Sequence, residues 1–146
     1  MIKIKTLFLV ITSFIAGIAL TISLMAIRLP KIQPVDEQTL WYLINYWRQT
    51  ENLQPLKKDD FLCQIAQKRF SEIIVNFKHP SPQSFLQLCP QCRGMGEILA
   101  TGQTEYEILQ SWLNSASHSA VLHDKGFTHS CIYTHGNTAI QIFAAY

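Results

Sequence analysis

The chain has 146 residues, a formal net charge of +2 and a hydrophobic fraction of 48%. This length fits one domain, and the many aliphatic and aromatic residues are enough to form a core, which argues against a disordered chain. The weak net charge comes without a basic cluster, so the sequence predicts no nucleic-acid partner.

The N-terminus carries an uncharged run at residues 6–27, which follows Lys3 and Lys5 and ends at Arg28. A helix that spans a bilayer needs about 20 apolar residues, whereas the apolar region of a cleaved signal peptide has about 7–15. The length of the run therefore favours a transmembrane helix that inserts into the membrane and stays attached to the chain.

This interpretation divides the chain into a membrane anchor at residues 1–28, a linker at 29–38 and a domain at 39–146. Cleavage after Gly17-Ile18-Ala19 is the alternative, and it would give a secreted protein. Both interpretations place the domain outside the cytoplasm, as a membrane-anchored or a secreted module.

Two helices are predicted in the first half of the domain. Asp36 begins the first, whose apolar stripe has helical spacing. Asp59 or Asp60 caps the second, which must end by Lys78 because the His-Pro-Ser-Pro sequence that follows cannot continue it. Arg69 interrupts the apolar stripe of the second helix. The stripes are Leu40, Leu43, Ile44 and Trp47 in the first helix, and Leu62, Ile65, Ala66, Ile73 and Phe77 in the second.

The second half is predicted to contain helices followed by a hairpin. Thr104 and Glu107 form a capping-box pattern that begins a third helix, and residues 116–122 form a short fourth one. Residues 84–96 are predicted to be mostly irregular. Two strands at residues 127–134 and 138–143 flank a turn. Helices followed by a hairpin predict an α+β fold, with helices packed on an antiparallel sheet.

The four cysteines, Cys63, Cys89, Cys92 and Cys131, are an even number, as expected for two disulfides in an exported domain. Three pairings are possible, and the sequence does not choose among them. The Cys-Pro-Gln-Cys segment could also be a redox motif, or bind structural zinc with His118 and His123. A structural disulfide is the commoner use of such a pair.

Spacing alone assigns no site to the five histidines, and the sequence contains no zinc-protease, phosphate-loop or nucleophile-elbow motif. Six segments in order, however, resemble the bacterial branch of the CAP (SCP-like, cysteine-rich secretory) family. Residues 43–48, 53–59 and 77–79 resemble the family patterns LIN..R, L.PL..D and F.H. Residues 96–102, 112–122 and 141–143 resemble GENIA.G, WMNSPGHRANIL and the end of YWVQVFG.

The resemblance implies a three-layer α-β-α sandwich with a cleft lined by histidines and acidic residues. Carried over by position, the cleft residues are His79, Glu97 and His118. The second glutamate of eukaryotic members has no counterpart here, where Asn114 and Ser115 occupy that region. Two histidines with a carboxylate can hold zinc and a water molecule, and Glu97 would then act as a base. A metal-dependent hydrolase that uses these three residues is thus one implied function.

The other implied function is a binding module for a small molecule, a lipid or a component of the cell envelope. It is favoured because three polar positions of the family patterns are changed. The Asn of GEN is Ile98, and the Arg and Asn of HRAN are Ser119 and Val121. A cleft that loses hydrogen-bonding groups is less suited to catalysis than to binding, and a fold does not by itself fix a function.

Overall fold

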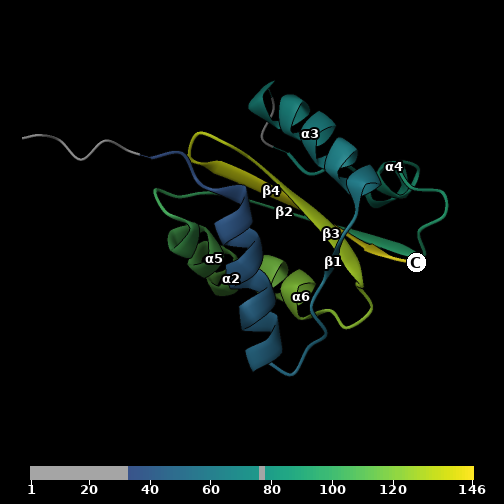
Figure 1. Ribbon diagram of the computed structural model, residues 1–146. Coiled ribbons are helices and arrows are strands. Elements are labelled where there is room, and N and C mark those ends of the chain that lie inside the picture. Colours follow the sequence, from purple (N-terminus) through teal and green to yellow (C-terminus); the bar gives the residue numbers. More distant parts are fainter. Residues whose placement is uncertain (1–32, 76–77) are drawn as a thin grey trace, which may run out of the picture. The chain divides into compact units, whose positions relative to one another are not determined.

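The computed structural model describes residues 33–75 and 78–146 of the chain (Figure 1). The described residues belong to one compact unit. The predicted anchor at residues 6–27 lies outside the described residues, as does Phe77. Within the described ranges, none of the helices combines the length and the apolar character that crossing a bilayer requires.

A four-stranded sheet forms the centre of this unit, with the strand order β1-β3-β4-β2. β3 and β4 form an antiparallel hairpin around Gly136, whose φ of +60° suits glycine. β2 pairs antiparallel with β4 along its whole length, and the short β1 pairs parallel with β3. The strands are β1 (Lys57–Lys58), β2 (Gly94–Thr101), β3 (His129–His135) and β4 (Thr138–Ala145).

The predicted hairpin is confirmed, but the prediction for residues 84–96 is wrong at both ends. α4 (Pro82–Leu86) covers the start of this segment, and β2 begins at Gly94 near its end. Glycines are poor strand formers, so the Gly-Met-Gly start of β2 gives no local strand signal. Its conformation is set by pairing with β4, in a register that joins Gly94 to Ala145.

The helix starts that the sequence predicted are confirmed. The Asp36 side chain accepts a hydrogen bond from the Thr39 amide at 2.6 Å, and Asp59 does the same for Leu62 at 3.0 Å. Thr104 accepts one from the Glu107 amide at 3.2 Å. The helices are α2 (Glu37–Thr50), α3 (Asp60–Val75), the short α4, α5 (Glu105–Asn114) and α6 (Ala116–His123).

Helices cover both faces of the sheet (Figure 1). α2, α5 and α6 share one hydrophobic cluster with the sheet, and α3 and α4 share another. Successive residues of β2 accordingly point to opposite faces: Ile98 and Ala100 belong to the first cluster, and Leu99 to the second. The arrangement is a mixed α+β fold with three layers, as the family resemblance implies.

A fully buried arginine joins α2 to α6. Arg48 Nη1 donates a hydrogen bond to the carbonyl of Leu122 at 2.6 Å, and its Nε donates to the carbonyl of Gln54 at 3.0 Å. Because the last carbonyls of a helix have no partner within the helix, Arg48 satisfies one at the end of α6. It thereby fixes the helix that carries His118.

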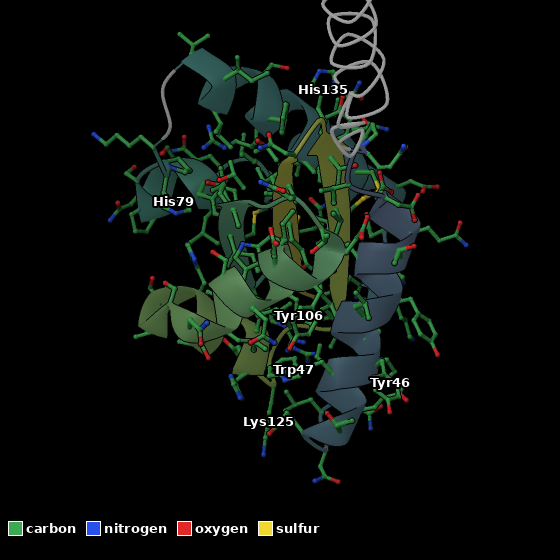
Figure 2. All side chains as sticks on the ribbon, turned by 90° about the vertical axis from the view of Figure 1, so that its left-hand side faces the viewer. Tyr46, Trp47, His79, Tyr106, Lys125 and His135 are labelled. Carbon is green, nitrogen blue, oxygen red and sulfur yellow. A yellow bond between two sulfur atoms is a disulfide. The ribbon has the colours of Figure 1, made fainter. Side chains whose placement is uncertain are left out.

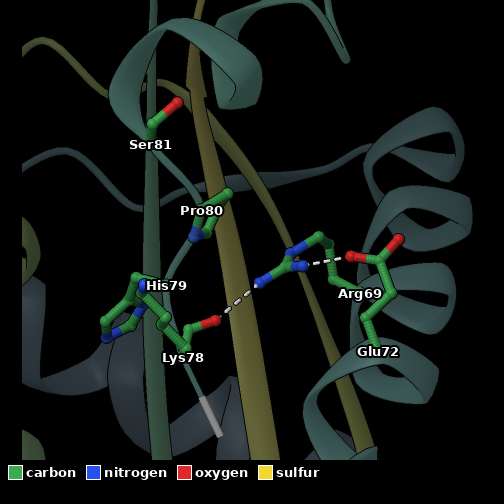
Figure 3. Close-up of a pocket in the computed structure, with 6 residues that line it drawn as sticks. All are labelled: Arg69, Glu72, Lys78, His79, Pro80 and Ser81. Carbon is green, nitrogen blue, oxygen red and sulfur yellow. Dashed lines mark hydrogen bonds and ion pairs between the residues drawn. The ribbon is translucent and has the colours of Figure 1, made fainter. Parts of the chain in front are cut away.

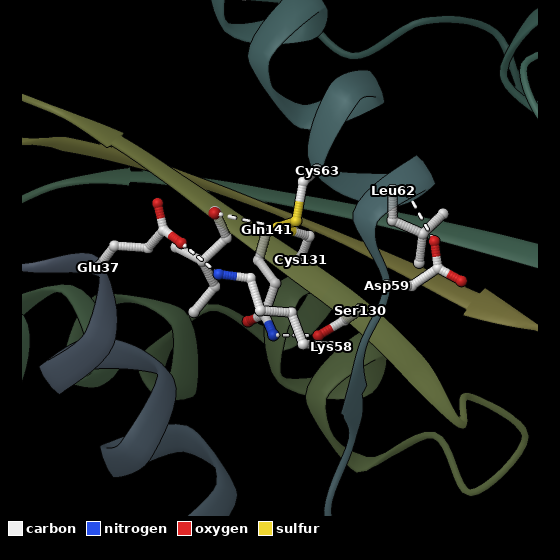
Figure 4. The surroundings of a disulfide bond; sticks show 9 residues. Glu37, Lys58, Asp59, Leu62, Cys63, Ser130, Cys131 and Gln141 are labelled. Atoms are coloured by element: carbon white, nitrogen blue, oxygen red, sulfur yellow. Dashed lines mark hydrogen bonds and ion pairs between the residues drawn. A yellow bond between two sulfur atoms is a disulfide. The ribbon is translucent and has the colours of Figure 1, made fainter.

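Both disulfides form within the described residues, and they settle the pairing that the sequence left open. Cys63–Cys131 ties α3 to β3 across 68 positions of sequence (Figure 4), whereas Cys89–Cys92 closes a local turn after α4. The first is therefore a bond between two layers of the fold.

The two disulfides should contribute unequally to stability. On the loop-entropy argument, Cys63→Ala/Cys131→Ala should lower the free energy of unfolding by about 4 kcal/mol, and Cys89→Ala/Cys92→Ala by about 2 kcal/mol. Urea unfolding of both variants under oxidising conditions measures this. Equal losses, or a larger loss for the local bridge, would contradict the layer-joining role of Cys63–Cys131.

Candidate functional site

The structure brings the three predicted site residues to the exposed edge of the sheet. Glu97 lies in β2, which is the last strand in the sheet order. His79 comes from the segment between α3 and α4, labelled in Figure 2, and His118 comes from α6. The rings of His79 and His118 lie 5.9 Å apart between centroids, with their planes at 68°. The site thus combines residues from both helix layers around one edge strand.

Glu97 lies behind His79 and is nearly inaccessible, with 3% of its side chain exposed against 50% for His79. Its Oε1 is 2.9 Å from Nδ1 of His79. Because an ionised carboxylate only accepts hydrogen bonds, His79 donates from Nδ1, and in the neutral ring its Nε2 is left as an acceptor. Glu97 therefore orients His79, and His79 is the residue of the pair that a ligand can reach.

Arg69 of α3 is the partner of Glu97 that the sequence analysis did not assign to the site. Its Nε donates to Glu97 Oε2 at 2.8 Å, and its Nη2 donates to Oε1 at 3.2 Å. Only 8% of its side chain is exposed. The hydrogen bond to Glu97 is the main reason why the pKa of Arg69 is raised. A charged residue within an apolar helical stripe was the available signal, because such a charge needs a buried partner.

Two further contacts tie Arg69 to its surroundings. Nη2 also donates to the backbone carbonyl of Lys78 at 3.2 Å, and Nη1 forms an ion pair with Glu72 (Figure 3). The Lys78 contact holds the backbone directly before His79. Arg69 thus fixes His79 twice, once through the preceding peptide and once through Glu97.

A pocket of about 350 Å³ adjoins this cluster (Figure 3). Its volume lies at the lower end of the range for sites that bind small organic molecules, roughly 300–1,000 Å³. His79 forms part of its wall, whereas Glu97 and His118 are not among its lining residues. The lining consists of Arg69, Glu72, Lys78, His79, Pro80 and Ser81.

The residues present do not fit a catalytic zinc site. Two imidazoles at this separation are close enough for a shared ion after small movements, since zinc–nitrogen bonds are about 2.0–2.1 Å long. Such a site needs a third protein ligand, but both oxygens of Glu97 already accept hydrogen bonds from Arg69. Among residues 33–75 and 78–146, no group of three His, Cys, Asp or Glu side chains is placed to hold a metal ion.

Two of the changed family positions contribute to the core. Ile98 is fully buried on the face of β2 opposite to Glu97, in the cluster shared with α2 and α5. Val121 packs against the same cluster, and a Cβ at Gly96 would come within 3.0 Å of its Cγ1. The change from asparagine to Ile98 therefore removes no hydrogen-bonding group from the side of β2 that carries Glu97.

His118 should titrate below the ordinary histidine pKa of 6.5, because burial and the charge of His79 both disfavour its protonated form. An NMR pH titration of the imidazole signals measures this. In His79→Gln the pKa of His118 should rise part of the way back, since that change removes the charge and leaves the burial.

The lowered pKa of His118 also predicts how the stability of the fold changes with pH. Between the lowered pKa of the folded state and the ordinary value, the unfolded state binds more protons, so stability increases with pH. The contribution of His118 is complete above pH 6.5 and is lost as the pH falls through the folded-state pKa. A stability difference between the native chain and His118→Gln that stays constant from about pH 7.5 to about pH 5 would contradict the shift.

Comparison with known proteins identifies the family and the fold. Residues 41–143 match the model of the CAP family, described as the cysteine-rich secretory protein family. No curated protein matches the chain.

Three solved bacterial structures share the fold. A cysteine-rich secretory protein of Staphylococcus aureus has a TM-score of 0.67 at 19% identity, over 74% of this chain and 38% of that one. An extracellular protein of Bacillus anthracis with an SCP domain has a TM-score of 0.65 at 24% identity, over 75% and 40%. An outer surface protein of Borrelia burgdorferi has a TM-score of 0.64 at 23% identity, over 74% and 90%.

The chain aligns with about two fifths of the first two structures and with most of the third. These likenesses concern the fold, and the family model covers well over half of the chain, including all three predicted site residues. The chain therefore belongs to the CAP family of cysteine-rich secretory proteins.

Proposed function

We propose that this chain is an extracytoplasmic CAP module that binds a small molecule, a lipid or a cell-envelope component at the site formed by His79 and His118. Residues 6–27 would anchor it in the membrane, and cleavage of that segment would release it as a secreted protein. The observation that carries the binding proposal is the pocket of about 350 Å³ beside a half-exposed imidazole that Glu97 orients from behind.

Three observations support the extracytoplasmic location. The described part of the chain has two disulfides and no free cysteine, as is typical of oxidising compartments. The fold is shared with an extracellular protein of Bacillus anthracis and an outer surface protein of Borrelia burgdorferi. The uncharged run at residues 6–27 has the length of a membrane span.

The engagement of Glu97 favours binding over metal-dependent hydrolysis by His79, His118 and Glu97. Both oxygens of this carboxylate accept hydrogen bonds from Arg69, so neither is free to bind an ion or to position an attacking water molecule. His79, in contrast, is half-exposed and is held by Glu97 at Nδ1, so Nε2 of the neutral ring can accept a hydrogen bond from a hydroxyl or amide group of a ligand.

The proposal predicts a saturable change in the imidazole NMR signals of His79 and His118 when an organic ligand occupies the site. The full chain in detergent micelles would be titrated separately with soluble peptidoglycan fragments and with short-chain phosphatidylglycerol. The response should disappear in His79→Ala/His118→Ala. It should persist in His135→Ala, which removes an exposed histidine at the hairpin turn.

Hydrolysis of either probe by the native chain, abolished in the double variant, would replace the binding proposal with an enzymatic one. Signals of both histidines that stay unchanged with every probe would remove the site from consideration for these ligand classes. A response of equal size in the double variant would place binding elsewhere on the chain.

A further inference from the structure

We propose that Arg69 is a built-in cation of the site, a positioning residue that occupies the place a metal ion would take beside Glu97 and that holds His79 in its orientation. The proposal goes beyond the proposed function, because it concerns the ligand class that the site rejects. It holds whichever organic partner binds.

The burial of Glu97 is the first step. With 3% of its side chain exposed, its carboxylate needs a cation or several hydrogen-bond donors. Arg69 supplies both through the planar fork of its guanidinium, which contacts each carboxylate oxygen, at 2.8 and 3.2 Å. A divalent cation bound to the same carboxylate would lie within a few ångströms of a permanent positive charge, and Coulomb repulsion opposes this.

The second step concerns the residues around the guanidinium. Apart from Arg69, the nearest ionisable side chains of the cluster are Glu97, Glu72 and the two imidazoles, together with the exposed Lys78. Without the guanidinium, Glu97 would be a buried carboxylate with no cation beside it, 2.9 Å from Nδ1 of His79, whose ring lies 5.9 Å from that of His118. Carboxylates and imidazoles are ligands that zinc accepts. These side chains are not placed around an ion in the native chain, so the loss of Arg69 would have to let them rearrange, and Arg69 holds them in the hydrogen-bonded arrangement instead.

The third step is the effect on His79. Arg69 contacts the Lys78 carbonyl at 3.2 Å and, through Glu97, the Nδ1 side of the His79 ring. These contacts fix the backbone and the ring of His79 while leaving Nε2 free. Arg69 does not itself need to touch a ligand, and its role is to position the residue that does.

The proposal is tested by calorimetric zinc titration of the full chain in detergent micelles. The native chain should show no saturable binding in the micromolar range. Arg69→Met, which keeps the length of the side chain and removes its charge and donors, should bind one zinc ion at least about tenfold more tightly. Arg69→Lys keeps the charge and should behave like the native chain. Arg69→Met/Glu97→Gln should lose the gain, because it lacks the freed carboxylate.

A merely structural role for Arg69 would lower stability without a gain in zinc affinity. If Arg69→Met folds only with zinc, or melts at a higher temperature in its presence, the proposal is also supported, because metal binding is then coupled to folding. The native chain alone can also overturn the proposal. It does so if it binds one zinc ion tightly and loses this binding in His79→Ala/His118→Ala. A folded Arg69→Met with no gain would also overturn it. Since zinc is the probe throughout, these outcomes are independent of whether an organic ligand binds.

Discussion

The buried ion pair between Arg69 and Glu97 is the interaction on which the site depends. Either charge would be costly to bury without the other. The cost of removing both from water is offset because the guanidinium of Arg69 donates hydrogen bonds to both carboxylate oxygens of Glu97. The pair also joins α3 to the edge strand β2. The same helix is joined to β3 by the Cys63–Cys131 disulfide. The disulfide and the ion pair therefore fix the position of α3 against the sheet at two points. The segment that carries His79 follows this helix in the sequence.

The opposite side of the site depends on a second buried arginine with different partners. Arg48, near the end of α2, donates to the backbone carbonyl of Gln54 in the loop that follows this helix and to that of Leu122 near the end of α6, and so holds α6 by a hydrogen bond to the main chain. Gly96 allows α6 to approach β2 closely, since a Cβ there would be only 3.0 Å from side-chain atoms of Val121 and Phe127. His118 reaches the edge of the sheet because of this close packing. The two histidines thus meet through two independent sets of contacts, one in each helix layer.

The local features of the fold could be predicted from the sequence, because they depend on neighbouring residues. Asp36, Asp59 and Thr104 each cap a helix through a hydrogen bond to an amide three residues ahead. The features that were missed or left open depend on distant partners. β2 begins with Gly94, where only pairing with β4 produces a strand, and the cysteine pairing joins positions 68 residues apart. Spacing could not bring the site residues together either; the family resemblance could, because it reports a fold already known.

Arg69 shows the same limit at the site itself. The sequence revealed a charge within an apolar stripe, but its partner is 28 positions away and on another element. The changed position at Ile98 was interpreted as a loss from the cleft. Because neighbouring residues of a strand point to opposite faces, it lies in the core and leaves the surroundings of Glu97 unchanged. A sequence pattern places adjacent residues in one site, whereas in a strand the side chains of adjacent residues point to opposite faces of the sheet.

The family fold and the chemistry of the site are therefore determined by different residues. The topology places His79, Glu97 and His118 together through the edge position of β2 and the packing of both helix layers, and a chain that keeps this topology keeps the three positions. On the proposal for Arg69, the group that neutralises Glu97 decides whether they act as ligands of an ion or as a hydrogen-bonding surface. In this chain that group is the guanidinium of Arg69 in α3. On the proposal for Arg69, a single residue of α3 decides which class of ligand the same three positions accept, which is a physical reason why membership of a fold family does not fix function.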